Sequence, residues 1–354
     1  EPVQGFSKQP GQPTYPVVTA QVVNTGVCTA PALAMSQLSP CPKLFVVGCP
    51  HSGTALVASL MAEHRDIVLV PRETQIYQLV YEPFIELPRW NWQRRWRSWQ
   101  LILRRYGIKP LLLGFQPADI WRGILRNYRR LHQTDGHGLV SYGELKALIQ
   151  LIRADIPETN RGLVQAEELI AAMFDRFSER YVHPGQTILE RTPLHICYAE
   201  QILWRFPEAR IVEVIRDGRD VCVSYNALAQ QEGRTRLGTT DAIWQWKQCV
   251  EWGELIRNRP GLGARAYTVR YEALKADPQG CMGKLFEFAN LSWDEQQIRE
   301  IIKTADMGRG KNQGDGQDVK SGLVGGWKQH LSGADVAVCD EIAGEQLVRS
   351  GFAV

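Results

Sequence analysis

The segment from residue 43 to residue 74 constrains the fold more than any other part of the chain. It opens with the apolar run LFVV at 44–47, a pattern typical of a strand buried on both faces of a parallel sheet. Residues 48–54 are rich in Gly, Pro and Ser and predict a tight turn, and residues 54–63 predict a helix with a broad apolar face. A second short strand is predicted at 67–70. This order predicts an α/β fold with a P-loop-like parallel sheet flanked by helices.

The predicted turn at 48–54 is a candidate anion-binding loop. The first amides of a helix have no partner within the helix, and the helix dipole is positive at that end. Gly53 lets the backbone approach an anion closely, and the hydroxyls of Ser52 and Thr54 are further donors. The nearest common motif is the Walker A loop, GxxxxGK[ST], but its lysine is missing here. On this segment alone, an ordinary turn between a strand and a helix is the alternative.

The sequence PHSGT at 50–54 resembles the 5′-phosphosulfate loop of sulfotransferases that use 3′-phosphoadenosine-5′-phosphosulfate (PAPS). That loop usually reads Pro-Arg/Lys-Ser/Thr-Gly-Thr, so His51 stands where the family carries a permanent cation. A histidine is a cation only when it is protonated, so we expect activity to depend on pH. The resemblance implies that PAPS is a co-substrate and that its phosphosulfate group is bound by His51, Ser52, Gly53, Thr54 and Ala55.

A second informative region predicts a further part of the same sheet. Its order of elements is a βαβα unit, whose parallel strands imply a right-handed crossover. The predicted elements are a strand at 187–189, a helix at 195–206, a buried strand at 211–215 and a helix at 221–228.

Arg216 follows the second of these strands, and Ser224 lies eight residues later. The sequence IRDGRDVCVS resembles the motif with which sulfotransferases bind the 3′-phosphate of PAPS, through an arginine at a strand end and a serine eight residues on. Arginine presents a planar fork of donors to a phosphate, and serine adds a hydroxyl. The resemblance implies this role for Arg216 and Ser224. The alternative is a strand-end arginine paired with Asp217 or Asp220.

Two further residues are candidates for the chemical step. Glu73 and Thr74 resemble the Glu-Thr-Arg of tyrosylprotein sulfotransferases, in which the glutamate is the base, although Gln75 replaces the arginine. Arg191 precedes a Thr-Pro pair and resembles a basic residue that the family places near the transferring sulfuryl group. The resemblance implies that Glu73 takes the acceptor proton and that His51 and Arg191 stabilise the developing charge. A surface carboxylate paired with Arg72 is the alternative for Glu73.

Two later segments complete the resemblance. RYEAL at 270–274 follows a predicted strand at 266–269 and resembles the family's RYE[DQ]L, so Tyr271 is expected near the nucleotide. GGWK at 325–328 resembles the end of the mobile loop that covers the adenine and the 3′-phosphate. A tryptophan can stack on a purine and a lysine can meet a phosphate. The residues implied to bind the nucleotide here are Gly326, Trp327 and Lys328.

The rest of the chain predicts the domain organisation. Residues 1–42 are interpreted as an N-terminal tail or linker, or as a membrane-proximal stem, and residues 43–354 as one catalytic domain. Residues 81–182 are expected to form a helical insertion that contributes to the acceptor region. Within it, the Trp- and Arg-rich stretch 89–106 predicts an amphipathic basic helix, either packed on the domain or contacting the acceptor or a membrane surface. Residues 133–144 resemble an EF-hand loop without its first carboxylate, so a plain helix–turn–helix is preferred to a calcium site.

Composition excludes several classes of protein. The formal net charge of +3 is too small for a dedicated nucleic-acid-binding protein. Eight cysteines without CxxC spacing indicate no zinc site, and Cys49 and Cys222 are predicted to be buried free thiols. No apolar run has transmembrane length. Free thiols and the lack of a visible signal sequence favour the cytoplasm, whereas a trimmed stem would place the chain in the Golgi lumen. The sequence indicates no oligomeric state.

The function predicted from these residues is transfer of a sulfuryl group from PAPS to an acceptor hydroxyl by in-line displacement, without a metal. The acceptor is a carbohydrate, a tyrosine or a small alcohol, and the sequence does not choose among them. The alternatives are a P-loop nucleotide kinase, disfavoured by the missing Walker lysine, and a non-catalytic nucleotide-binding module with a degenerate site.

Overall fold

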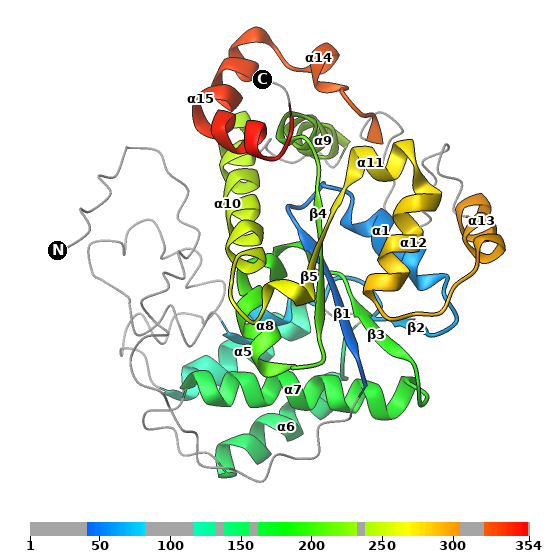
Figure 1. Ribbon diagram of the computed structural model, residues 1–354. Helices are drawn as coiled ribbons and strands as arrows, with labels where there is room; N and C mark the ends of the chain where they lie inside the picture. Colours follow the sequence, from blue (N-terminus) through cyan, green and yellow to red (C-terminus); the bar gives the residue numbers. More distant parts are fainter. Residues whose placement is uncertain are drawn as a thin grey trace. The chain divides into compact units, whose positions relative to one another are not determined.

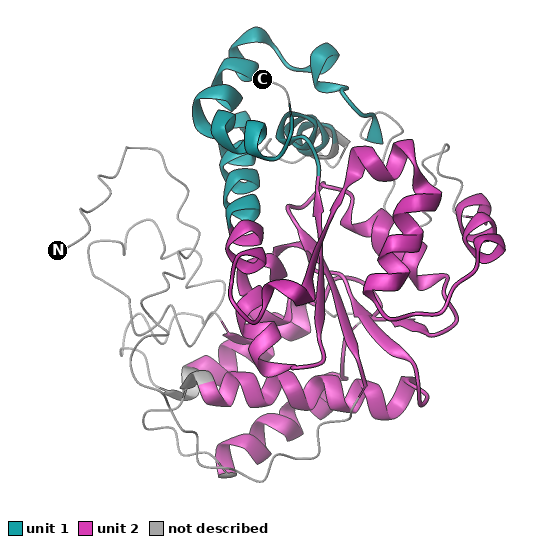
Figure 2. Ribbon diagram, in the orientation of Figure 1, with its two compact units in different colours: residues 1–34, 216–251, 308–354 teal, residues 35–215, 252–307 magenta. Residues whose placement is uncertain are grey.

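The computed structural model describes six stretches of the chain, separated by gaps (Figure 1). They are residues 41–81, 117–131, 138–155, 162–231, 238–304 and 322–352. The predicted tail up to residue 40, the Trp- and Arg-rich stretch 89–106 and residues 133–137 of the EF-hand-like loop lie outside them. The chain divides into two compact units (Figure 2). Unit 1 contains residues 1–34, 216–251 and 308–354, and unit 2 contains residues 35–215 and 252–307.

Unit 2 is built on a parallel sheet, as the sequence predicts. Its described residues form five strands in the order β2-β3-β1-β4-β5, with every pair parallel (Figure 1). The strands are β1 (Lys43–Gly48), β2 (Ile67–Leu69), β3 (Thr187–Glu190), β4 (Arg210–Ile215) and β5 (Ala266–Arg270). The central β1 is buried along its whole length, which explains its unbroken apolar run.

The strand order reverses direction at β1. From β1 the chain moves to β2 and β3 on one side, and later to β4 and β5 on the other. Phe45 of β1 lies opposite Glu190 of β3, and Gly48 of β1 lies opposite Val214 of β4. Ligands of open parallel sheets bind beyond the carboxyl ends of the strands at such a reversal. The loops that follow β1, β2 and β3 are therefore the candidate site of unit 2.

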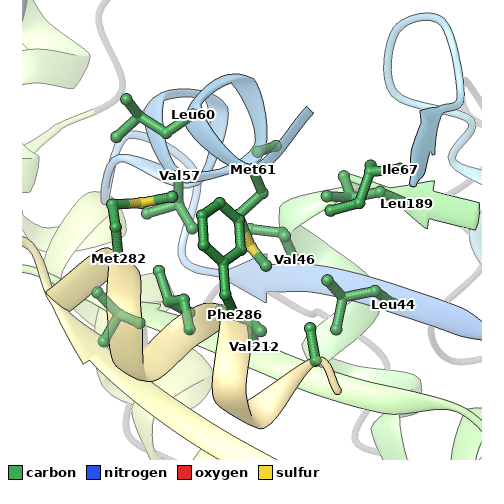
Figure 3. Close-up of a cluster of buried hydrophobic side chains, with 14 of the residues drawn as sticks. Leu44, Val46, Val57, Leu60, Met61, Ile67, Leu189, Val212, Met282 and Phe286 are labelled. Carbon is green, nitrogen blue, oxygen red and sulfur yellow. The ribbon is translucent and has the colours of Figure 1, made fainter. Parts of the chain in front are cut away.

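One face of the sheet packs against α1 (Thr54–Ala62) and α12 (Pro278–Phe288), and Figure 3 shows this core. Val46 and Val212 of the sheet, Met61 of α1 and Phe286 of α12 are buried in it. Burial of a side chain of this size contributes about 1.5–3 kcal/mol. Helices α11 (Tyr271–Ala276) and α13 (Glu295–Thr304) extend the same layer. The core thus holds the start of α1, and with it the loop 48–54, against the sheet.

The described part of the predicted insertion is helical. The π-helix η2 (Tyr77–Tyr81) leads into it, and the α-helices α5 (Pro117–Leu131), α6 (Tyr142–Asp155) and α7 (Gly162–Tyr181) lie within it. The carboxylate of Glu144 accepts the amide of Ser141 at 2.7 Å, the Ser141 hydroxyl accepts the amide of Glu144, and Glu144 pairs with Arg180. Glu144 thus caps the start of α6, which is the ordinary role of a glutamate three residues after a serine.

The prediction of a single helix at 195–206 is wrong, because the helical segment begins two residues earlier and its first part is not an α-helix. The chain forms a 3₁₀ helix, η5 (Pro193–Tyr198), followed by α8 (Ala199–Arg205). Pro193 suits the first turn because it lacks an amide hydrogen. The tighter turn directs His195 into the interior, where its ring contacts Glu190. A short 3₁₀ helix, η6 (Gly263–Arg265), precedes β5.

Unit 1 contains α9 (Gly218–Gln231), the larger part of α10 (Thr239–Arg257), α14 (Trp327–His330) and α15 (Gly333–Arg349). The indole N–H of Trp246 donates to the carbonyl of Arg216 at 2.8 Å, and Phe352 packs edge-on against the Trp246 ring. The hydroxyl of Thr239 donates to Asp335, which also closes the capping box of α15 with Ser332. These contacts give unit 1 its own core around Trp246.

Candidate functional site

The loop after β1 is a tight turn followed by a helix start. The amide of Ser52 donates to the carbonyl of Cys49 at 3.1 Å, with Pro50 second in the turn and His51 third at φ 68°. Proline followed by a positive φ is the arrangement of a type II turn, and histidine adopts this φ more often than most residues. The first bond of α1 runs from the Val57 amide to the Gly53 carbonyl. The amides of residues 54–56 therefore have no partner within the helix, whereas the turn uses the Ser52 amide.

Two glycines make this loop possible. Gly53 has φ 100°, and a Cβ there would lie 2.5 Å from Cδ2 of Tyr271. Gly48 has φ 147°, and a Cβ there would lie 2.4 Å from the carbonyl oxygen of Val214. The buried ring of Tyr271, at the start of α11, thus packs directly against the loop. The structure brings together the predicted residues Gly53 and Tyr271, which are far apart in sequence.

Two side chains of unit 2 retain donors that suit an anion. Ser52 is fully buried, and its hydroxyl oxygen has no hydrogen-bond partner among the described residues. The buried Nε of Arg191 likewise has none within the described stretches. A buried polar group without a partner costs about 1–3 kcal/mol, so an anionic group that accepts these bonds would be favoured. Both groups follow the carboxyl end of a strand, β1 for Ser52 and β3 for Arg191.

Glu73 lies in the loop after β2. Its side chain is exposed, whereas that of the adjacent Thr74 is buried. The two residues that flank the pair Glu73–Thr74 have a left-handed backbone, with φ 59° at Arg72 and 48° at Gln75. The hydroxyl of Thr74 donates to the carboxylate of Glu190 at 2.9 Å. This contact connects the segment that carries Glu73 to the one that carries Arg191.

Sequence reasoning missed Glu190 and His195 as parts of this region. Both are completely buried, and Nδ1 of His195 lies 2.9 Å from Oε2 of Glu190. Burial opposes the charge of Glu190, but the His195 ring and the hydrogen bonds from His195 and Thr192 outweigh it and lower the pKa of Glu190 to about 2. A glutamate at the end of a fully buried strand was the signal that could have identified this pair.

In unit 1, the predicted 3′-phosphate residues lie just before α9, at Arg216, and in the middle of it, at Ser224. Arg216 is buried and donates through one terminal nitrogen to the carbonyl of Leu323 at 3.0 Å, and Ser224 is buried on α9. The two aspartates that are the alternative partners for Arg216 have further contacts of their own, and the charge of Arg216 acts to lower the pKa of Asp220. Asp217 forms a two-point pair with Arg219, at 3.0 and 2.8 Å. Asp220 accepts two backbone amides of the C-terminal segment 322–328.

The segment 322–328 is bound to the start of α9 through Asp220 and Arg219. The two carboxylate oxygens of Asp220 accept the amides of Gly325 at 2.7 Å and Trp327 at 2.8 Å. Burial raises the pKa of Asp220, although these two bonds act against the rise. The guanidinium of Arg219 lies 3.8 Å from the centroid of the Trp327 ring. One face of Trp327 is therefore occupied by Arg219, while Lys328 is exposed on α14.

A family model described as Sulfotransferase family matches residues 42–295. The match spans well over half of the 354-residue chain and includes the loop 48–54, Glu73, Arg191, Arg216, Ser224 and Tyr271. The chain belongs to the sulfotransferase family. The match ends before the segment 322–328. The prediction of a sulfotransferase is confirmed at the level of the family.

Several solved structures are similar to this sulfotransferase. One is the sulfotransferase domain from the Synechococcus PCC 7002 olefin synthase, with TM-score 0.45 and 16% identity over 85% of this chain and 94% of that one. Another is sulfotransferase STF9 from Mycobacterium avium, with TM-score 0.46 and 16% identity over 89% and 78%. A third is mouse sulfotransferase SULT7A1 complexed with PAP, with TM-score 0.45 and 13% identity over 88% and 86%. A comparison with curated proteins finds no match.

Three further findings concern the described part of the sulfotransferase. Cys49 and Cys222 are buried free thiols, as predicted. Within the described ranges, no cluster of three or more His, Cys, Asp or Glu side chains has the arrangement of a metal site. Among the helices described, none combines the length and the apolar character needed to cross a bilayer.

Proposed function

We propose that this sulfotransferase transfers a sulfuryl group from PAPS to an acceptor hydroxyl and releases adenosine 3′,5′-bisphosphate. The observation that carries the proposal is the Ser52 hydroxyl, buried without a hydrogen-bond partner among the described residues, beside the helix amides of residues 54–56. Such a loop suits a sulfate or phosphate group, because it offers several donors and a positive helix end to one anion. Membership of the family supports sulfuryl transfer as the reaction.

Each part of PAPS has its own candidate residues. In unit 2, the 5′-phosphosulfate group is assigned to His51, Ser52, Gly53, Thr54 and Ala55, with Tyr271 beside them. In unit 1, Arg216 and Ser224 are assigned to the 3′-phosphate. The nucleoside is assigned to Gly326, Trp327 and Lys328, with the purine on the face of Trp327 away from Arg219.

The chemical step is an in-line displacement at sulfur. The acceptor oxygen forms a new bond to sulfur while the bond from sulfur to the 5′-phosphate oxygen breaks, and the nucleotide leaves with the electron pair. Glu73 takes the acceptor proton, a role worth about 10²–10⁴-fold in rate. Protonated His51, Arg191 and the first amides of α1 stabilise the charge on the sulfuryl oxygens and the leaving phosphate.

Calorimetric titration tests the nucleotide site directly. Adenosine 3′,5′-bisphosphate, 5′-AMP and ATP are titrated into the wild-type chain and into Arg216→Ala. We expect selective binding of the bisphosphate and a loss of about 10–100-fold in affinity in the variant, because a charged hydrogen bond contributes about 1.5–3 kcal/mol. Equal or tighter binding of ATP, indifferent to Arg216, would overturn the proposal and favour a nucleotide kinase.

For the acceptor, we propose only the reacting group, which is a hydroxyl. A peptide tyrosine is the first class to test, because Glu73 and Thr74 match the tyrosylprotein type. Carbohydrates and small alcohols are the other classes in the same screen. Transfer of ³⁵S from labelled PAPS identifies the class, and a folded chain that binds the bisphosphate but labels none of them would indicate a non-catalytic module.

A further inference from the structure

A buried carboxylate at the end of β3 organises the loops that follow β2 and β3. Oε1 of Glu190 accepts the hydroxyls of Thr74 at 2.9 Å and Thr192 at 2.6 Å. Oε2 accepts the amide of Thr192 at 3.0 Å and faces Nδ1 of His195 at 2.9 Å. Glu190 is fully buried, and the two threonines are almost so. With the amide of Thr74, at 3.4 Å from Oε1, five donors converge on one charge that water does not reach.

The orientation of His195 follows from its second nitrogen. The amide of Tyr77, in η2, donates to Nε2 of His195 at 3.4 Å. In the neutral ring Nε2 is the acceptor of this amide, so the one ring proton lies on Nδ1, which donates it to Glu190. The ring thus connects the carboxylate to the backbone of η2, and Tyr77 packs edge-on against it.

The backbone that precedes η2 depends on the same group. The amide of Thr74 points to Oε1 of Glu190 at 3.4 Å, and that of Gln75 donates to the Thr192 hydroxyl at 3.1 Å. The amide of Ile76 donates to the Thr74 hydroxyl at 3.3 Å. Together with Tyr77, four consecutive amides end on Glu190 or on a side chain bonded to it. Left-handed conformations such as that of Gln75 cost about 1–3 kcal/mol and persist only where surrounding contacts require them.

We infer that Glu190 is a positioning residue that sets Glu73 and Arg191 in place for the reaction. Thr74, which follows Glu73, is bonded to Glu190 directly. Arg191 stands between Glu190 and Thr192, and both of these belong to the network. One buried charge thereby determines the backbone of the proposed base and of the proposed cation. The inference rests on the proposed function, which supplies the roles of Glu73 and Arg191.

The test uses substitutions that remove hydrogen bonds of this network at nearly constant volume. Thr74→Val loses the hydroxyl that binds Glu190, Thr74→Ser keeps it, and Glu190→Gln removes the charge. We expect Thr74→Val and Glu190→Gln to lower kcat by about 10–100-fold, since a shift of about 1 Å in a reacting group has an effect of this size. Thr74→Ser should stay within about threefold of wild type. Affinity for adenosine 3′,5′-bisphosphate, measured by calorimetry, should fall much less than kcat does, because Thr74 and Glu190 are assigned to no part of that nucleotide and only Arg191, which Glu190 positions, is expected to meet its 5′-phosphate.

Glu213 provides a matched control for the loss of a buried carboxylate. It lies in β4, is 3% exposed, and contacts Arg257 and the hydroxyl of Thr268. Glu213→Gln should lower the melting temperature as Glu190→Gln does, but leave kcat within about twofold when activity is expressed per folded molecule. A similar fall in kcat for both variants would overturn the inference, because it would show a general effect of destabilisation.

A double-substitution cycle decides whether Thr74 acts through Glu73. In a chain that already carries Glu73→Gln, adding Thr74→Val should reduce kcat by less than about threefold, because the Glu73 carboxylate that Thr74 positions is absent. The inference would be overturned if Thr74→Val lowered kcat as much in the Glu73→Gln chain as in the wild type. It would also be overturned if Thr74→Val alone left kcat unchanged in an active enzyme. Either result would leave the proposed function intact. A folded wild-type chain that transfers no sulfuryl group from PAPS would overturn the proposed function and this inference together.

Discussion

His51 is the residue whose chemistry most distinguishes this loop from the family pattern that it resembles. It is third in the turn 49–52, at φ 68°, and is half-buried. An imidazole ordinarily loses its proton at a pKa of about 6.5, and a neighbouring phosphate favours the protonated form. The residue therefore makes the proposed stabilisation of the leaving group dependent on pH.

We expect kcat to fall as pH rises through the pKa of His51 in the complex with PAPS, by up to about 10²-fold, the effect of one lost donor to a developing anion. His51→Arg keeps its charge and should flatten this limb of the pH–rate profile. His183→Arg, at an exposed histidine outside the site, is the control and should leave the profile unchanged. A profile identical in wild type and His51→Arg would remove His51 from the chemical step.

At the scale of elements, Asp220 of α9 makes two of the hydrogen bonds that hold the C-terminal segment 322–328. The two oxygens of Asp220 accept two amides of the segment, and Arg216 donates to its Leu323 carbonyl. In an asparagine an NH2 donor replaces one of these two oxygens, so one of the two amides loses its acceptor. The segment that carries three proposed nucleotide residues is thus bound to the helix that carries Ser224.

Asp220→Asn should therefore loosen the segment and weaken nucleotide binding. We expect faster hydrogen exchange at residues 322–330 and a loss of about 5–20-fold in affinity for adenosine 3′,5′-bisphosphate, as for one or two lost hydrogen bonds. Asp241→Asn in the first turn of α10 is the control. Unchanged exchange and affinity in Asp220→Asn would show that Asp220 does not hold the segment.

At the scale of the whole molecule, buried carboxyl groups link folding to pH in opposite directions. Glu190 has a pKa lowered to about 2, so its contribution is present at neutral pH and is lost as pH falls from about 4.5 toward 2. Glu167 of α7 has a carboxyl oxygen that is buried without a hydrogen-bond partner among the described residues, and burial raises its pKa to about 8. Between about pH 4.5 and 8 the folded chain keeps this proton while the unfolded chain releases it, so stability falls as pH rises.

Glu167→Gln should remove that decline. We expect the variant to have a higher melting temperature than wild type at pH 8, by several degrees, and a smaller difference at pH 5, because the amide has no proton to lose. Thermal unfolding from pH 5 to 8.5 measures this. Glu179→Gln, at an exposed glutamate of the same helix that pairs with Arg176, is the control. Parallel pH curves for wild type and Glu167→Gln would contradict the raised pKa.

The sequence by itself determined the parallel sheet, the loop after β1 and the family, because each depends on local patterns. Apolar runs at 44–47 and 211–215 specify buried strands, PHSGT specifies the turn, and the eight-residue spacing relates Arg216 to Ser224. Only the tertiary structure decided the hydrogen-bond partners of Glu190 and Asp220. The bond between Glu190 and Thr74 spans 116 residues, and that between Asp220 and Trp327 spans 107. Local patterns do not encode which buried donor meets which acceptor, because packing of the whole chain makes that choice.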